Sequence, residues 1–212
     1  KSNPKVTSVV IGAGITEIGA GAFDSCINLT SVTFANTTGA MVIGDNAFSG
    51  CTQVTEITLP AQTTSIGAKA FYMTKLNGFT IPETVTSIGA QAFAYTNIST
   101  INIPAAVTYI GDGAFMNAAS LSSVTFAGGT EPLVIGAVDM EATSVQLQTD
   151  WSKVGDTKFD IVGAFAGTAL TEISLPANIS VIGDFTFSGL TGLATVNIPA
   201  DAQLTQVGMS AF

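Results

Sequence analysis

Hydrophobic and polar positions along the chain follow one pattern that returns at nearly constant intervals. An Ile-Gly pair with a phenylalanine four residues after the glycine begins at Ile18, Ile43, Ile66, Ile88, Ile110 and Ile182, and Val207-Gly208 repeats it with valine. In the first half of the chain, successive phenylalanines of this motif are 25, 23, 22 and 22 residues apart. A fixed period in this range is the sequence signature of a solenoid, in which each repeat forms one coil.

A second block with strict alternation lies between these landmarks. It reads Leu-x-x-Val-x-Phe or a close variant, as at residues 29–34, 54–59 and 76–81, and in several copies a proline follows. Period-two alternation predicts a strand with one face buried, and proline ends such a strand because it has no N–H to donate. The Val-x-x-Ile residues that lead into each Ile-Gly pair predict a second short extended segment, and the glycine of the pair permits a turn.

One such unit cannot bury its own apolar face, but neighbouring units can do so by stacking strand on strand at about 4.8 Å. About eight or nine coils would form a rod on the order of 40 Å long. Aspartate follows the glycine at Asp45, Asp112 and Asp184, where a carboxylate would cap a short helix. We therefore expect one mainly β domain over residues 1–212, a right-handed solenoid with short turn or helical segments.

The composition narrows the classes of function. The chain has 212 residues, 47% of them hydrophobic, with mean hydropathy +0.50 and a net charge of −9 from 15 acidic residues and six lysines. A nucleic-acid binder needs a basic stripe, which this chain lacks. Without histidine it can build neither a Ser-His-Asp nor a Cys-His nucleophile pair, and no apolar run is long enough to span a bilayer. We therefore expect no enzyme activity, cofactor, metal, nucleic-acid partner or membrane insertion.

The repeat, written I-P-x-x-V-x-x-I-G-x-x-A-F-x-x-C-x-x-L, resembles the leucine-rich repeats of the BspA-like surface-protein family over nearly the whole chain, from Val6 to Phe212. The resemblance implies a leucine-rich-repeat solenoid exported to a bacterial or protist cell surface, where members are associated with adhesion to host matrix glycoproteins and to other microbes. The function we expect is a non-catalytic, extracellular adhesion or ligand-binding module with a protein, glycoprotein or glycan partner. The alternative is a structural spacer that carries other domains and has no ligand of its own.

The pattern is interrupted once, over residues 137–160. Ile135-Gly136 is present, but the period resumes only at Ala164-Phe165, and residues 139–160 hold seven of the 21 charged residues together with the only tryptophan, Trp151. Insertions in solenoids usually map to loops on one face, often the binding face. Two interpretations stay open, a degenerate repeat with a solvated hairpin and a contact site that includes Asp150, Trp151 and Lys153.

One outward strand position carries small hydrogen-bonding side chains in every complete repeat. It is occupied by Thr33, Thr58, Thr80, Asn102 and Thr125, and then by Ser174 and Asn197. A ladder of hydroxyls and amides along a sheet is a candidate platform for sugars or for a peptide strand, although threonine also suits any solvent-facing strand position. The first five of these residues, with Asp150, Trp151 and Lys153, are the candidate ligand-binding residues.

The two cysteines, Cys26 and Cys51, occupy the same position in successive repeats. Stacking would bring them about 5 Å apart, which is close enough for a disulfide on distance alone. Elsewhere the position is mostly threonine or alanine, and cysteine also behaves as a small core hydrophobe. The sequence leaves both states open.

Both ends of the sequence lack a polar capping segment, since the chain begins with Lys1-Ser-Asn-Pro4 and closes within a motif on Ala211-Phe212. A solenoid needs capped ends for solubility. We expect a fragment of a longer surface protein, with a leader that is removed or lies outside this sequence. We also expect the C-terminal coil to associate end to end with another molecule.

Overall fold

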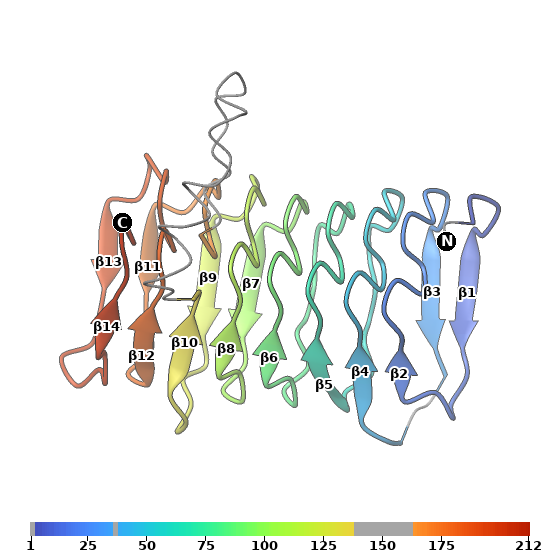
Figure 1. The fold of residues 1–212 in the computed structure, drawn as a ribbon, viewed down its shortest axis with the longest axis horizontal. Coiled ribbons are helices and arrows are strands. Elements are labelled where there is room, and N and C mark those ends of the chain that lie inside the picture. Colours follow the sequence, from blue (N-terminus) through green and yellow to red (C-terminus); the bar gives the residue numbers. More distant parts are fainter. Residues whose placement is uncertain (1–2, 36–37, 138–162) are drawn as a thin grey trace, which may run out of the picture.

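Short strands stack along one axis to form a β-solenoid of eight coils, with the two termini at opposite ends (Figure 1). The computed structural model describes residues 3–35, 38–137 and 163–212. Each coil contributes one strand to an eight-stranded parallel sheet, six strands form a second array opposite it, and the apolar side chains between the arrays form a continuous core. The predicted β-solenoid is confirmed.

The first array is an eight-stranded parallel sheet built from the segments that end at each Ile-Gly pair. In spatial order its strands are β14 (Gln206–Val207), β12 (Ile179–Ile182), β10 (Leu133–Ile135), β8 (Tyr109–Ile110), β6 (Ser87–Ile88), β5 (Thr63–Ile66), β4 (Met41–Ile43) and β2 (Glu17–Ile18). The isoleucines of neighbouring coils pair in register, as Ile18 does with Ile43 and Ile66 with Ile88. Identical side chains therefore form one column in the core.

The second array consists of three parallel pairs built from the alternating block. These pairs are β1 (Ser8–Ile11) with β3 (Ser31–Phe34), β7 (Thr100–Ile103) with β9 (Ser123–Phe126), and β11 (Glu172–Ser174) with β13 (Thr195–Asn197). Residues 54–59 and 76–81 were expected to be strands and are not. Gly78 has no side chain to pack in a strand, and the Phe79 ring, where other coils have valine or isoleucine, turns against Phe71 and Phe93 at 5.3 and 4.8 Å.

Phenylalanine side chains form a second column through the core. The rings of Phe23, Phe48, Phe71, Phe93, Phe115, Phe165, Phe187 and Phe212 stack one on the next with centroids 5.3–5.5 Å apart and interplanar angles of 2–14°. The six inner rings are almost completely buried. Stacking and burial together make this column a major source of stability.

The segment around each of these phenylalanines is a pair of turns, so of the turn or helical segments that were expected, the part of the chain that the structure describes has turns. In the first coil the Ala22 N–H donates to the Gly19 carbonyl and the Cys26 N–H donates to the Phe23 carbonyl, both at 3.1 Å. The Phe23 N–H instead donates to Ala47 of the next coil at 2.8 Å. Because alternate N–H groups bond between coils, they are not free for the bonds of a helix.

In most of the Ile-Gly pairs the glycine is required by space rather than by a turn. Gly44, Gly67, Gly89 and Gly111 do not have the left-handed φ for which glycine is usually selected. A Cβ on Gly89 would lie 2.5 Å from the Gly67 carbonyl carbon and still closer to the Ala68 nitrogen. The backbones of successive coils therefore approach so closely at this corner that no larger residue fits.

The aspartates that follow these glycines hold neighbouring coils together. The Ala68 N–H donates to Asp45 Oδ1 at 2.7 Å, the Ala137 N–H to Asp112 at 2.7 Å and the Met209 N–H to Asp184 at 2.6 Å. The N-cap role expected for the three aspartates is therefore wrong, because each carboxylate accepts from a residue one coil further along. These contacts clamp adjacent coils at the same corner.

We expect Asp112→Asn to be at least as stable as the wild type at pH 7, and Asp112→Ala to be less stable by about 1 kcal/mol. Burial raises the pKa of Asp112 above its ordinary value, the charge of Asp184 adds to this, and the bond from Ala137 opposes it. A carboxyl whose pKa is higher in the folded state costs stability as pH rises from its unfolded to its folded pKa. Asparagine avoids that cost and keeps an acceptor for the Ala137 N–H, whereas alanine removes the acceptor.

Denaturant titration of the three proteins at about pH 4 and pH 7 measures this effect. Any advantage of Asp112→Asn should shrink at the lower pH, because the protonated fraction of the wild-type carboxyl rises as the pH falls. Equal losses for the asparagine and alanine variants at pH 7 would contradict the role assigned to the carbonyl acceptor.

The interrupted repeat keeps its place in the phenylalanine column. Ile135-Gly136 is continued in space by Ala164-Phe165, because the Phe165 ring stacks on Phe115 at 5.4 Å and the Phe115 N–H donates to Ala164 at 2.8 Å. Phe115 follows Ile110 by five positions, whereas Phe165 follows Ile135 by 30 positions. This coil therefore has 25 additional residues. Both interpretations of residues 137–160 concern residues that lie almost wholly outside the described part of the chain.

Candidate functional site

Five of the predicted site residues lie in one column on the outer face of the second array. We call this surface the polar strand face and define its central column as Thr33, Thr58, Thr80, Asn102, Thr125, Ser174 and Asn197. All seven side chains are exposed, while their neighbours along the chain point into the core. The register of the strand pairs places Asn102 beside Thr125 and Ser174 beside Asn197.

A parallel outer column widens this face. It is formed by Ser31, Glu56, Gly78, Thr100, Ser123, Glu172 and Thr195, all exposed. The sequence interpretation did not include these residues as site residues, although the same period-two alternation places them two residues before the central column. Since only two of the 14 positions carry a charge, the face offers mainly uncharged hydrogen-bonding groups.

Neighbouring side chains of the central column bond to one another in places. The Thr125 hydroxyl donates to Asn102 Oδ1 at 3.0 Å, and Asn197 Nδ2 donates to the Ser174 hydroxyl at 3.1 Å. Among the described residues, the hydroxyls of Thr58 and Thr80 have no hydrogen-bond partner. The middle of the column therefore presents free donors and acceptors to solvent.

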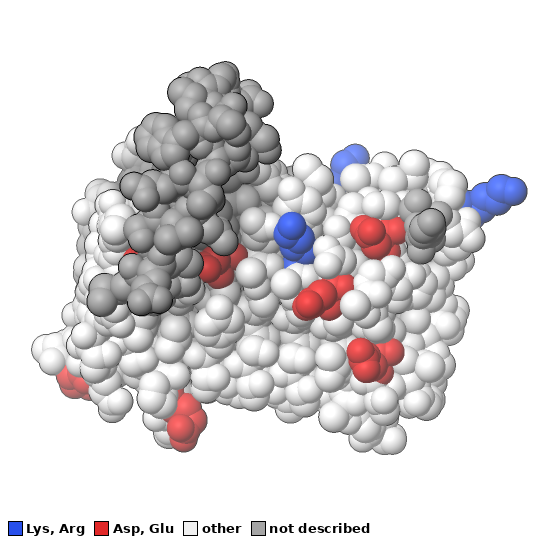
Figure 2. All heavy atoms as spheres, in the orientation of Figure 1, with Lys and Arg blue, Asp and Glu red and all other residues white. Residues whose placement is uncertain are grey.

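The opposite face, formed by the eight-stranded sheet, uses several of its hydroxyls internally. Thr64, Thr86 and Thr108 donate to backbone carbonyls of the preceding coil at 3.2–3.3 Å, and Ser180 and Thr205 do so at 3.0 Å. Figure 2, drawn with this sheet towards the viewer, shows only scattered charged side chains over the described surface. Both faces are therefore uncharged for the most part.

A small aromatic cluster on the turns was missed from the sequence. The rings of Tyr72 and Tyr95 meet edge to face at 5.5 Å, and Lys69 Nζ lies 5.6 Å from the Tyr72 ring centroid. Met116 packs against the same cluster. The signal was available, since both tyrosines follow a motif phenylalanine by one or two residues.

The remaining three predicted site residues, Asp150, Trp151 and Lys153, lie outside the described residues. Whether they adjoin the polar strand face therefore stays a prediction. Ala137, which precedes them, is held on both sides, because its N–H donates to Asp112 and its carbonyl accepts from the Asp184 N–H at 3.0 Å.

Both cysteines are buried and free. The Cys51 thiol donates to the Phe23 carbonyl at 3.1 Å, and burial raises the pKa of this thiol to about 12. A thiol with so high a pKa is neither a nucleophile nor a ready metal ligand near neutral pH. Of the two states that the sequence left open, the structure has the reduced one.

Two general findings concern the described ranges 3–35, 38–137 and 163–212. Within them, no three acidic or cysteine side chains gather as metal ligands would. They also include no helix that is long and apolar enough to cross a membrane.

Stacked coils of 22–25 residues, with in-register isoleucine and phenylalanine columns, define a leucine-rich-repeat solenoid as the class of protein. The family model described as "BspA type Leucine rich repeat region" matches six copies over residues 1–122 and 162–212. The chain therefore belongs to the BspA-type leucine-rich-repeat family. No curated protein matches it.

Several solved structures are similar to this chain. A leucine-rich repeat protein from Eubacterium ventriosum is 25% identical with a TM-score of 0.64, and the match covers 98% of this chain and 51% of that one. The T. pallidum leucine-rich repeat protein is 22% identical with a TM-score of 0.59, over 95% of this chain and 73% of that one. A leucine rich cell surface protein from Faecalibacterium prausnitzii is 22% identical, with a TM-score of 0.45, over 97% and 60%. This chain thus spans about half the length of the Eubacterium protein.

Proposed function

We propose that this chain is a non-catalytic, extracellular ligand-binding module of a microbial surface protein, and that its polar strand face carries the binding site. The observation that carries the proposal is the central column of exposed hydroxyl and amide groups, whose middle members Thr58 and Thr80 have no partner within the described chain. Membership of the BspA-type family supports an adhesive role at the cell surface.

The chemistry of this face favours an uncharged, hydrogen-bonding ligand. Hydroxyl and amide side chains repeat along the solenoid at the spacing of stacked strands, about 4.8 Å. Such a row matches the hydroxyls of a glycan or the backbone of an extended peptide on a glycoprotein. Because few charges line the face, we expect the affinity to change little with salt concentration.

One observation favours a second function, that of a spacer without a ligand. The unbroken stack of eight phenylalanine rings gives a rod whose coils repeat the same contacts from end to end. A rod of this kind would hold another domain away from the cell even if its surface bound nothing.

Replacing Thr80 with arginine should weaken ligand binding by about tenfold or more, because a long charged side chain would cover the free hydroxyls. The test is a panel of fibrinogen, fibronectin, mucin and a glycan array on the immobilised chain. Ser87→Arg is the matched control, since Ser87 lies on the eight-stranded sheet and faces away from the polar strand face.

The two substitutions separate the functions. Loss of ligand binding by Thr80→Arg, together with normal binding by Ser87→Arg, would support binding through the polar strand face. Equal binding by both variants would contradict the choice of face. If the wild type bound no member of the panel, the spacer function would be favoured.

A further inference from the structure

The turns that contain the motif phenylalanines form one edge of the solenoid, between the ends of the eight-stranded sheet and the beginnings of the second array (Figure 1). From the first coil to the seventh, the second residue after the motif phenylalanine has a left-handed φ of 54–74°. Two coils in the middle of the chain place Met73 and Tyr95 there, at φ 58° and 61°. The other coils place a small residue or asparagine at this position, namely Ser25, Gly50, Asn117, Gly167 and Gly189.

A bulky side chain in this backbone conformation is strained, because its Cβ comes too close to a carbonyl oxygen. Lys69, two residues before its motif phenylalanine, is strained in the same way at φ 55°, where the first and fifth coils have Gly21 and Gly113. Residues held in such conformations cluster at functional sites. The side chains of Lys69, Met73 and Tyr95 therefore indicate a function for this part of the edge.

The three strained residues belong to the aromatic cluster on the turns. Tyr72 meets Tyr95 edge to face, and Lys69 Nζ lies 5.6 Å from the Tyr72 ring centroid. Met73 is 45% exposed, and Tyr95 is partly exposed. We call this surface the aromatic turn patch and define it as Lys69, Tyr72, Met73 and Tyr95. It combines an apolar platform with one positive charge.

The aromatic turn patch is a basic site on an acidic protein. The chain has a net charge of −9, yet residues 61–82 contain Lys69 and Lys75 and no acidic residue. Within the described part of the chain neither lysine forms an ion pair. Asp45, in the preceding coil, accepts from the Ala68 N–H instead. The charge of the patch therefore complements a ligand with a single negative group, whereas the rest of the protein repels a polyanion.

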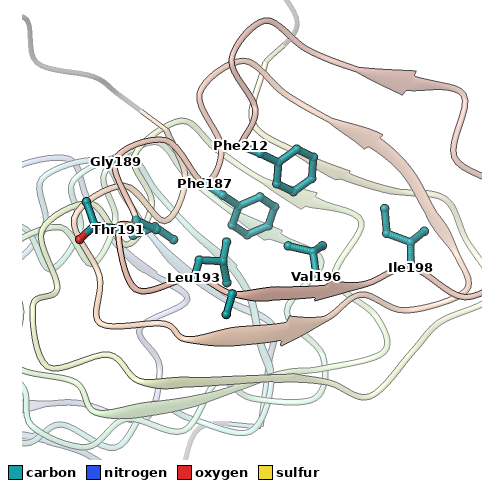
Figure 3. A pocket seen from close by; sticks show the side chains of 9 residues that line it. Phe187, Gly189, Thr191, Leu193, Val196, Ile198 and Phe212 are labelled. Carbon is teal, nitrogen blue, oxygen red and sulfur yellow. The ribbon is translucent and has the colours of Figure 1, made fainter.

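A hollow of about 620 Å³ beside the last coil, where Phe187, Val196 and Phe212 surround one open space, is of a different kind (Figure 3). Neither lysine nor tyrosine is among the residues that line it. It therefore lacks both of the groups that define the aromatic turn patch.

We propose that the aromatic turn patch binds a sugar that carries a carboxylate, at the end of a glycan chain. The C–H face of the sugar ring would pack on Tyr95 and Met73, and its carboxylate would pair with Lys69. A tyrosine ring suits such a ligand, because it offers an apolar face beside a polar hydroxyl.

The size of the patch favours one terminal sugar over a protein surface. The patch spans two coils, and the coils on either side have Gly50 and Asn117 in place of the large side chains. A stable protein interface buries about 800 Å² on each partner, which is more than four side chains provide. This site is separate from the polar strand face, so it goes beyond the proposed function.

Titration of the chain with sialyllactose, a glucuronate-ended disaccharide and lactose, each to about 10 mM and followed by NMR chemical shifts, tests the proposal. At least one of the two acidic sugars should bind, and it should bind at least about tenfold more tightly than neutral lactose. Added salt should weaken this binding, because the pair between Lys69 and the carboxylate is exposed and therefore screened.

Two variants use residues that neighbouring coils already carry at the same position. Lys69→Gln copies Gln91, and Tyr95→Asn copies Asn117. Both should fold, with thermal midpoints by circular dichroism within about 4 °C of the wild type, and each should weaken binding of the acidic sugar by at least about tenfold. Lys5→Gln, which removes the same charge from the first coil, should bind as the wild type does.

Several results would overturn the proposal. Neither acidic sugar could bind, or Tyr95→Asn could bind as tightly as the wild type although it is folded. A short polyglutamate peptide could bind more tightly than the acidic sugars, which would indicate an acidic peptide as the partner. Thr80→Arg could abolish binding of the acidic sugar, which would place it on the polar strand face. Unchanged binding by Thr80→Arg would support a separate site, so the two sites can fail independently.

Discussion

Gly89→Ala should lower the free energy of unfolding by about 3 kcal/mol, the upper range for overpacking a filled site. The added methyl group would meet backbone atoms of Gly67 and Ala68, and backbone cannot move aside as the tip of a flexible side chain can. To accommodate it, two coils must separate at this corner, which weakens the strand pairing of β5 and β6.

Urea unfolding followed by circular dichroism measures this loss. The control is Gly78→Ala, where an added Cβ meets nothing within 4 Å and φ is not left-handed. Alanine there should be neutral or should stabilise by up to about 1 kcal/mol, because it restricts the unfolded chain. Equal stability of the two variants would refute close coil approach as the reason for glycine in the motif.

Phe93→Ala should lower the free energy of unfolding by about 3–5 kcal/mol, because it leaves a cavity at a fully buried site in the middle of the ring column. The Phe93 ring is 0% exposed and contacts the rings of Phe71, Phe79 and Phe115 at 4.8–5.4 Å. The cavity would therefore remove contacts from two neighbouring coils at once.

Phe212→Ala is the matched control for the ring column, since its ring has one stacked neighbour and is 55% exposed. This variant should lose about 1 kcal/mol or less of the free energy of unfolding. Chemical denaturation of both variants gives the comparison. Similar losses would show that the column stabilises each coil separately and that position within the stack is unimportant.

The sequence predicted those features that depend on period alone. Alternation in residues 100–103 is enough to place Ile101 and Ile103 in the core and Asn102 in solvent, and the structure agrees. The central column of the polar strand face was therefore predictable residue by residue. Equal spacing also placed Cys26 and Cys51 at one position of successive coils.

Features that arise from contact between coils were beyond such reasoning. The partner of the Asp45 carboxylate is 23 residues away in Ala68, so a local capping rule assigned it to the wrong N–H. The glycine at position 89 was explained by a turn, because its close neighbours Gly67 and Ala68 lie 22 and 21 residues earlier. Of the turn or helical segments that were expected, the structure has turns, because alternate N–H groups bond along the axis instead.

The repeated corner at which glycine meets the preceding backbone has a consequence for how such chains change in length. Since each coil offers the same upper and lower surface, a duplication or deletion of one repeat rejoins surfaces that already fit. The coil that contains Ile135 and Phe165 shows in addition that 25 residues can enter at this corner while the rings on either side remain stacked. Genes of this kind can therefore lengthen, shorten or acquire new loops by recombination without the invention of a new core.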